Sequence, residues 1–303
     1  MKTRRQFLTS AAALGAVPCV AAAAESVPGA IDAHVHVWTP DISKYPLSPN
    51  YKVGDMKPPS FTPEELLAHS KPAGVSRIVL IQMSFYGTDN SYMLDVMKAH
   101  PGVLSGVAVI DEKAPEVAET MTELAKSGVR GFRIRSSKAN AESWLSSPEM
   151  NAMWTAGAAQ NLSMCLLADP DSLPAALKMC QKHPATPVVI DHFARIGVSG
   201  TIEKADLGNL LKFAELENVC VKTSAFYALG KKKPPYDDLG PMIRELRDAF
   251  GADRLMWASD CPYQVVDGHS YDASISLIRD RLDFLSEDER DWMLRGTAER
   301  VFF

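Results

Sequence analysis

Two histidines stand one residue apart in an otherwise apolar segment, residues 31–38, which reads Ile-Asp-Ala-His-Val-His-Val-Trp. Alternate residues of a β-strand point to the same face, so His34 and His36 are expected side by side. Paired imidazoles of this kind suit a divalent metal ion or the carbonyl of an acyl group. A strand with two half-exposed histidines gives the same pattern, so the interpretation needs support from the rest of the chain.

Support comes from titratable residues that follow other apolar segments. Asp191 and His192 follow one such segment, and Ser259 and Asp260 follow another near the end of the chain. The remaining candidates occupy corresponding places after or within further apolar segments: Gln82, Tyr86, Arg133, Arg135, Arg195 and Lys222. These residues can act together at one site only if the fold brings the ends of many strands to one face.

The apolar segments alternate with helix-like stretches throughout the chain. Eight strands are expected, at 31–37, 77–82, 104–110, 129–135, 163–168, 188–192, 220–224 and 255–260. Thr62-Pro63-Glu64-Glu65 predicts a capped helix start, and Ser286 predicts the start of the last helix. This order favours an α/β fold, a (β/α)8 TIM barrel, over a doubly wound open sheet. In such a barrel the active site lies at the carboxyl ends of the strands, where the candidates fall.

Composition limits the classes of partner. The 303 residues are 46% hydrophobic and 23% charged, which suits one large domain. The formal net charge is −5 and no long basic run stands out, so nucleic-acid binding is not expected. The expected partner is instead a small molecule, and the three arginines discussed below indicate that it is anionic. A homo-oligomer is compatible with the sequence.

The first 24 residues read as a twin-arginine signal peptide. Arg4 and Arg5 precede a weakly apolar, alanine-rich stretch, and residues 21–24 are all alanine, which suits a signal peptidase. An ordinary secretory signal is the alternative. We therefore expect a bacterial periplasmic protein whose barrel spans 25–303, with no membrane attachment after cleavage. Cys165 and Cys220 lie in strand-like segments and are expected in the core.

Five segments together resemble a known family. They are Ile-Asp-Ala-His-Val-His-Val-Trp (31–38), Val-Ile-Asp-His (189–192), Val-Lys-Thr-Ser (221–224), Met-Trp-Ala-Ser-Asp-Cys-Pro (256–262) and Arg-Gly-Thr-Ala-Glu-Arg-Val-Phe (295–302). In this order they are similar to the amidohydrolase-related branch of the amidohydrolase superfamily, and in particular to its lactonase-like group. The resemblance implies a (β/α)8 barrel and a hydrolase.

The resemblance also implies site residues. His34, His36, His192 and Asp260 match the family's site and are the expected metal ligands, with Asp260 and His192 as catalytic residues. Many members carry a bridging Lys or Glu on strand four and a histidine on strand five. This chain has Arg133 and Arg135 on strand four and no histidine at the end of strand five, so one metal ion is expected rather than two. Some lactonases of the branch work without metal, which leaves the cofactor open.

The expected reaction follows from these groups. One divalent ion, zinc in the simplest case, lowers the pKa of water enough for it to attack a lactone or amide carbonyl. Asp260 takes the proton and returns it to the leaving atom, while His192 binds the ion or polarises the carbonyl. Without a metal, the histidines polarise the carbonyl and Asp260 activates water. A core histidine at 192 and a turn cap at 260 are the structural alternatives.

Three arginines predict a carboxylate-bearing substrate, such as a sugar-acid lactone. Arg133, Arg135 and Arg195 offer the planar fork that binds carboxylates, and Gln82, Tyr86 and Lys222 follow as further substrate contacts. Salt bridges to acids of the rim are the alternative for each arginine, and pairing with Asp191 or Asp260 is the alternative for Lys222. A metal-dependent decarboxylase, or a periplasmic binding protein without catalysis, fits the same residues.

Overall fold

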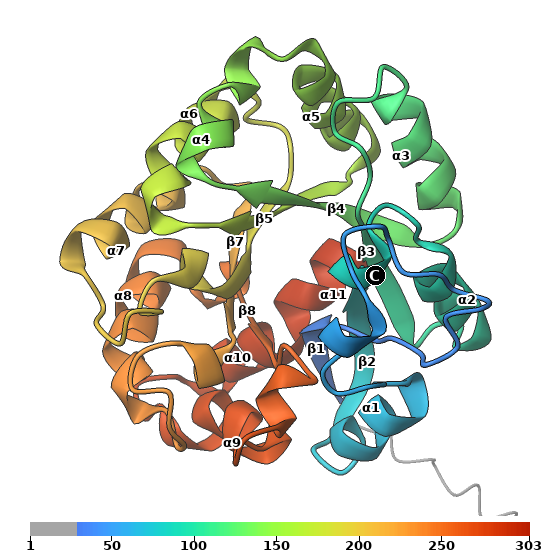
Figure 1. Cartoon of the computed structure of the whole chain (residues 1–303). Coiled ribbons are helices and arrows are strands. Elements are labelled where there is room, and N and C mark those ends of the chain that lie inside the picture. Colours follow the sequence, from blue (N-terminus) through green and yellow to red (C-terminus); the bar gives the residue numbers. More distant parts are fainter. Residues whose placement is uncertain (1–28) are drawn as a thin grey trace, which may run out of the picture.

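Eight parallel strands form a barrel in the computed structural model, which describes residues 29–303 (Figure 1). Each strand pairs with the next in sequence order. The strands are β1 (Ala30–Val35), β2 (Val75–Ile81), β3 (Leu104–Ala108), β4 (Val129–Ser136), β5 (Ser163–Ala168), β6 (Val188–Ile190), β7 (Val219–Ser224) and β8 (Leu255–Ala258). The predicted (β/α)8 barrel is confirmed over the doubly wound open sheet, because the strands follow one another in sequence order and the first meets the last.

Helices surround the strands in a ring (Figure 1). They are α1 (Pro63–Ser70), α2 (Ser91–Ala99), α3 (Val117–Lys126), α4 (Lys138–Ala141), α5 (Pro148–Gln160), α6 (Leu173–Lys182), α7 (Lys204–Leu211), α8 (Gly240–Phe250), α9 (Tyr271–Ser276), α10 (Glu287–Asp291) and α11 (Thr297–Phe302). Thr62 and Ser286 cap α1 and α10 as expected, each in a reciprocal capping box with a glutamate three residues later. The segment that Ser286 opens continues through a wider turn to α11, the last helix.

The core has two apolar layers. The outer layer lies between the strands and the ring of helices, and the inner layer fills the barrel. Cys165 and Cys220 lie in the inner layer, which confirms their expected place in the core. Ala298 and Phe302 of α11 belong to the same layer, so the last helix packs against one end of the barrel interior. The opposite end is left for the functional groups.

A short seam joins the first and last strands. A single parallel bridge, between Val35 and Cys261, connects them, with backbone hydrogen bonds from Asp260 N to His34 O and from His36 N to Cys261 O, both 2.9 Å. The side chain of Asp32 extends the seam by accepting a hydrogen bond from the backbone N–H of Ser259 at 2.9 Å. The residues that close the barrel are therefore the neighbours of the candidate site.

Five strands end earlier than the sequence predicts. The observed ends are Val35 in β1, Ile81 in β2, Ala108 in β3, Ile190 in β6 and Ala258 in β8, whereas the predicted ends are 37, 82, 110, 192 and 260. After β6 and β8, left-handed backbone at His192 and Asp260 ends the extended conformation; non-glycine residues seldom adopt left-handed backbone, and apolar periodicity does not reveal it.

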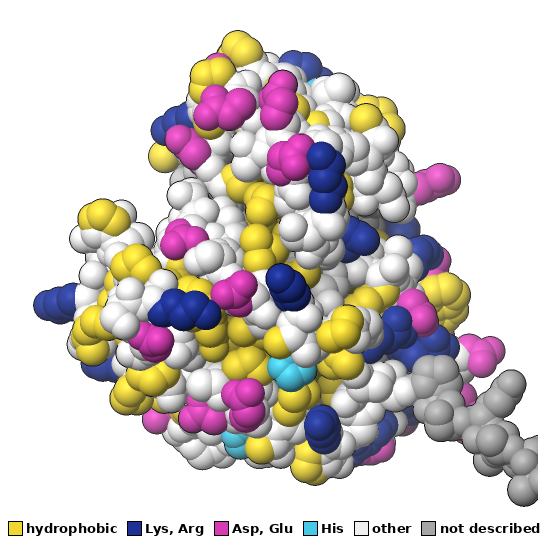
Figure 2. Space-filling view, turned by 90° about the vertical axis from the view of Figure 1, so that its right-hand side faces the viewer, with side chains coloured by type: hydrophobic (Ala, Val, Ile, Leu, Met, Phe, Trp, Pro, Cys, Tyr) yellow, Lys and Arg dark blue, Asp and Glu magenta, His cyan; other side chains and the backbone are white. Residues whose placement is uncertain are grey.

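The twin-arginine segment, residues 1–24, lies outside the described residues. Within residues 29–303, no helix combines the length and apolarity needed to cross a bilayer. On the face drawn in Figure 2, acidic and basic side chains are interspersed.

Candidate functional site

A β-bulge in β1 turns both histidines into the barrel. Asp32 pairs with Ile78 and Val35 with Leu80, so three steps along β1 match two steps along β2. Before the bulge, Ile31 and Ala33 point into the inner layer; after it, Val35 packs in the outer layer and His34 and His36 face inward. The extra residue therefore changes which positions in the chain reach the site.

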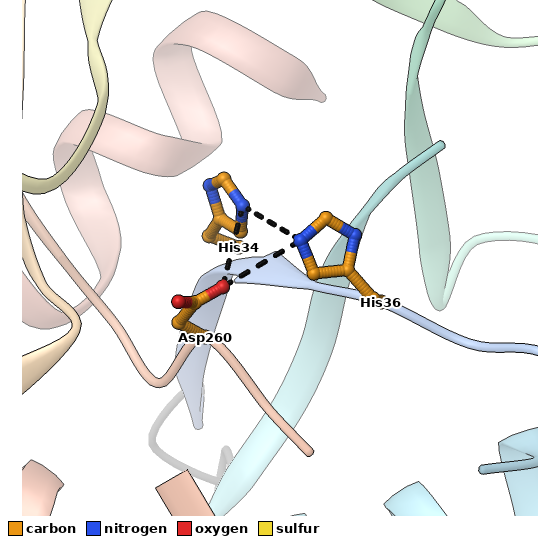
Figure 3. A group of neighbouring side chains, drawn as sticks. All are labelled: His34, His36 and Asp260. Atoms are coloured by element: carbon orange, nitrogen blue, oxygen red, sulfur yellow. Dashed lines mark hydrogen bonds and ion pairs between the residues drawn. The ribbon is translucent and has the colours of Figure 1, made fainter. Parts of the chain in front are cut away.

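His34, His36 and Asp260 form one compact, buried group (Figure 3). The Nε2 atoms of the two histidines are 3.3 Å apart, and each lies 3.6 Å from Oδ1 of Asp260. His36 donates from Nδ1 to the backbone oxygen of Ile81 at 2.9 Å; because that oxygen only accepts, Nε2 of neutral His36 keeps its lone pair for the site. Two imidazole nitrogens and one carboxylate oxygen are a donor set that suits zinc, so the residues fit the expected ion.

His192 lies beside this group and is held in place from behind. Its Nδ1 is 2.7 Å from the hydroxyl of Ser224, at the end of β7, and its Nε2 is 4.0 Å from Oδ1 of Asp260. The ring centroids of His34 and His192 are 4.4 Å apart. The structure thus brings together all four residues of the expected metal set, with His192 at its edge.

Left-handed backbone turns His192 and Asp260 toward the centre. Residues 192–195 have φ values of 52°, 53°, 54° and 60°, and Asp260 has a φ of 63°. Each such non-glycine residue costs about 1–2 kcal/mol relative to ordinary backbone. Strain of this kind is tolerated where surrounding packing fixes the chain, and here it lies directly at the candidate site.

Burial keeps the imidazoles neutral and makes Asp260 a weak acid. It lowers the pKa of His36 and of His192 to about 3, and it lowers the pKa of His34 well below its usual range. Burial also raises the pKa of Asp260 to about 7, although a hydrogen bond from Tyr227 acts against this. Neutral imidazoles can bind a cation, and a carboxylate of this pKa can exchange a proton near neutrality.

A buried ion pair lies behind His34. Lys222 Nζ is 3.0 Å from Oδ1 of Asp191 and 3.2 Å from Nδ1 of His34, and both charged side chains are fully buried. Burial alone raises the pKa of Asp191, but Lys222, with His34 and Arg133, holds it well below its usual range. Lys222 therefore forms the pairing that was the alternative to substrate contact, and it does not line the cavity.

An open cavity of about 790 Å³ leads to the site. Its lining includes Arg133, Arg135 and Arg195, and also Tyr227 and Tyr263, which lie near Asp260 and His36. Gln82 also lines it but donates its amide to the backbone oxygen of Asp89 at 2.6 Å.

Some of the side chains predicted to contact substrate are already paired with other protein groups, and others are not. Arg195 is paired with Asp169, and Arg133 approaches Asp191 at 3.9 Å and His36 at 3.4 Å. Within residues 29–303, no carboxylate oxygen lies within 4.0 Å of the nitrogens of Arg135. Tyr86 is outside the cavity lining: it is buried, and its hydroxyl accepts a hydrogen bond from the backbone N–H of Thr39.

Sequence reasoning missed Tyr227 and Asp32. Tyr227 donates a hydrogen bond to Oδ2 of Asp260 at 2.7 Å. Asp32 accepts a hydrogen bond across the seam from the backbone of Ser259, the residue before Asp260. The place of Tyr227, three residues after Ser224, follows the same rule of strand ends that selected the other candidates. Asp32 precedes His34 by two residues, and simple alternation would put the two side chains on the same face; the bulge between Asp32 and Val35 removes that relationship.

Comparison with known proteins agrees with this geometry. The family model for amidohydrolases matches residues 31–303. An L-fucono-1,5-lactonase of Burkholderia ambifaria is 30% identical over 275 residues, covering 88% of this chain and 93% of that protein. A 4-sulfomuconolactone hydrolase of Rhizobium radiobacter is 28% identical over 261 residues, covering 82% and 83%.

A solved structure shows the same fold. An amidohydrolase from Burkholderia multivorans, with bound zinc, superposes with a TM-score of 0.76 at 22% identity, covering 90% of this chain and 98% of that one. The family match begins one residue inside β1 and covers the rest of the barrel, including both sides of the seam. The chain therefore belongs to the amidohydrolase family.

Proposed function

We propose that this protein hydrolyses a lactone that carries a carboxylate. The observation that carries the proposal is the place of Asp260: a buried carboxylate faces three neutral imidazoles at the base of a cavity with arginines on its wall. That arrangement provides a proton acceptor, groups that polarise a carbonyl, and a binding site for an anion. The relatives named as lactone hydrolases support the choice of a cyclic ester.

The chain's own residues account for the proton transfers. A water molecule between Oδ1 of Asp260 and the lactone carbonyl gives its proton to Asp260 as its oxygen bonds to the carbonyl carbon. When the carbon–oxygen bond of the ring breaks, Asp260 returns the proton to the departing ring oxygen, and the product is an open hydroxy acid. His192, held through Nδ1 by Ser224, hydrogen-bonds the carbonyl oxygen when its Nε2 carries the hydrogen.

A single zinc ion fits the same residues. His34, His36 and Asp260 would hold it, and when bound it acts as a Lewis acid and lowers the pKa of water. The zinc in the structure from Burkholderia multivorans supports this choice of ion. Three protein ligands of this kind are typical of catalytic zinc sites, so the ion would remain accessible to water or substrate.

The anion of the substrate is proposed to bind Arg133 and Arg135. They are two residues apart on β4 and both line the cavity, so their guanidinium groups share one wall. Arg135 is exposed and Arg133 is half-buried. Paired guanidinium forks suit a carboxylate better than a neutral ring.

The test is turnover by wild-type protein and by Asp260→Asn on a panel of carboxylated and sugar-acid lactones. We expect ring opening by the wild type and a loss of about 10²–10⁴-fold in kcat in the variant, with binding of the lactone retained. Asp272→Asn, at an exposed carboxylate, is the control for charge. Unchanged turnover in Asp260→Asn would refute the mechanism.

The same panel distinguishes the alternatives. Release of carbon dioxide without ring opening identifies a decarboxylase, and release of an amine from amide substrates identifies an amide hydrolase. Binding without turnover in the wild type identifies a barrel that only carries its ligand.

We also propose export to the periplasm through the twin-arginine route, on the basis of Arg4 and Arg5. Fractionation of cells that express the wild type and Arg4→Lys/Arg5→Lys tests this. The wild type is expected in the periplasm and the variant in the cytoplasm; equal distribution contradicts the proposal.

A further inference from the structure

The two oxygens of the Asp260 carboxylate have different partners. Oδ2 accepts a hydrogen bond of 2.7 Å from the phenol of Tyr227. Oδ1 faces the histidines, at 3.6 Å from Nε2 of His34 and of His36 and 4.0 Å from Nε2 of His192. The rotation of this carboxylate about its Cβ–Cγ bond decides which oxygen meets the substrate. Among residues 29–303, the phenol of Tyr227 is the one group at hydrogen-bond distance from Oδ2.

The fold holds Tyr227 rigidly enough to serve this purpose. The chain leaves β7 at Ser224 and turns through left-handed backbone at Ala225, with a φ of 57°. Phe226 is then fully buried, with its ring centroid 6.2 Å from that of Phe193 and 5.8 Å from that of Tyr236. Tyr227 follows this anchor directly, and this places its phenol beside Asp260.

The phenol itself is a reliable donor. A phenol hydroxyl keeps its hydrogen at neutral pH, and that of Tyr227 is 2.7 Å from Oδ2 of Asp260. The ring packs 6.2 Å from Tyr263 and 6.0 Å from His269, and it lines the cavity beside the carboxylate. One hydroxyl hydrogen directed at one oxygen fixes the orientation of the acceptor.

We propose that Tyr227 is a positioning residue for Asp260. It occupies Oδ2, so that Oδ1 alone serves the proton transfer and the histidine group. In the lactone reaction this keeps the accepting oxygen toward the water. For a cation held by His34, His36 and Asp260, it makes the carboxylate a ligand through one oxygen rather than two. The kinetic part of the inference rests on the proposed lactone hydrolysis; the structural and cation-binding parts do not.

The experiment compares Tyr227→Phe with Tyr236→Phe. Both remove one hydrogen-bonded phenol oxygen and keep the ring, but the hydroxyl of Tyr236 is paired with His269 and Gln264, and Tyr236 does not line the cavity. For Tyr227→Phe we expect kcat to fall about 10–100-fold with KM within threefold, the usual effect of removing an outer partner of a site carboxylate. Tyr236→Phe is expected to retain kcat within twofold, which shows that loss of a hydrogen-bonded phenol hydroxyl near this loop does not by itself slow the reaction.

Two measurements do not depend on turnover. A crystal structure of Tyr227→Phe is expected to show the Asp260 carboxylate rotated, and competition with a chelator is expected to show zinc affinity altered about 10-fold or more, with no change in Tyr236→Phe. An unrotated carboxylate together with unchanged kcat overturns the inference. If the wild type opens no lactone but Tyr227→Phe still rotates Asp260, the positioning role stands and the proposed function fails.

Discussion

Asp32 and Ser259 are bonded across the seam that joins the first and last strands. Oδ1 of Asp32 accepts the backbone N–H of Ser259 at 2.9 Å and that of His34 at 3.2 Å, and Oδ2 accepts the hydroxyl of Tyr271 at 2.6 Å. A carboxylate thus satisfies backbone groups that a regular ladder of strand hydrogen bonds satisfies elsewhere in the barrel. Because the carboxylate is fully buried, water cannot take its place.

Replacement of Asp32 should weaken the seam. Asp32→Ala leaves three buried donors without an acceptor and is expected to lower the free energy of unfolding by about 1–3 kcal/mol per group left unsatisfied. Asp32→Asn keeps one oxygen and the shape, so it should cost less than Asp32→Ala. Urea unfolding measures both, with the exposed Asp272→Ala as the control. Equal stability of Asp32→Ala and wild type contradicts the assignment.

The buried pair of Lys222 and Asp191 predicts a compensating double substitution. Lys222→Met leaves the Asp191 carboxylate charged and buried, and is expected to cost about 3–5 kcal/mol in the free energy of unfolding. Asp191→Asn in the same chain removes that charge and should recover part of the loss. Lys126→Met, at an exposed pair with Glu123, should change stability by about 0.5 kcal/mol or less. A double variant no more stable than Lys222→Met contradicts the pairing.

The arginines of the cavity should contribute unequally. Arg135→Gln removes a cation with no carboxylate partner within the described residues, and is expected to raise KM for a carboxylated lactone about 10-fold with little change in kcat. Arg195→Gln should raise KM less, because Asp169 already neutralises Arg195. Steady-state kinetics on the same substrate separate the two. A larger effect at Arg195 shows that the substrate displaces Asp169.

The ligand group predicts how zinc content responds to substitution. Protein purified without chelator should hold about one zinc per chain if the site is of the single-ion kind that His34, His36 and Asp260 fit. His34→Ala/His36→Ala should lose it, whereas His183→Ala, at a histidine that is bonded to Asn151 and is not part of the cavity lining, should keep it. Elemental analysis measures all three. Zinc retained in the double variant places the ion elsewhere, and absence of zinc in the wild type favours the mechanism without metal.

The sequence predicts the barrel well because apolar periodicity reports burial on both faces of a strand. Once the strands are placed, the sequence also predicts the histidine pair and Asp260 as site residues, because the carboxyl ends of parallel strands meet at one face. It cannot predict the bulge in β1, which depends on pairing with Ile78 and Leu80. Asp32 and His36 are each two residues from His34, so alternation alone cannot show that Asp32 belongs to the seam and His36 to the site.

Partners distant in the sequence account for the remaining differences. In the sequence, Arg195 and Lys222 both resemble free anion-binding groups. In the structure, Arg195 is paired with Asp169, and Lys222 is paired with Asp191. Tyr86 follows a strand, as a site residue does, but its hydroxyl meets the backbone of Thr39 instead. In each case the type of residue is informative and the partner is decided by packing.

The seam has a consequence for the order of assembly. Asp32 and Ser259 are 227 positions apart, so the contact that closes the barrel is among the most distant in the chain. Contacts of long sequence separation form late and slowly, after nearer strands have paired. A growing chain therefore carries His34 and His36 for most of its synthesis without Asp260 beside them. The group of His34, His36 and Asp260 can bind a cation or substrate only after the last strand has docked. Occupancy of this site therefore indicates that the barrel has closed.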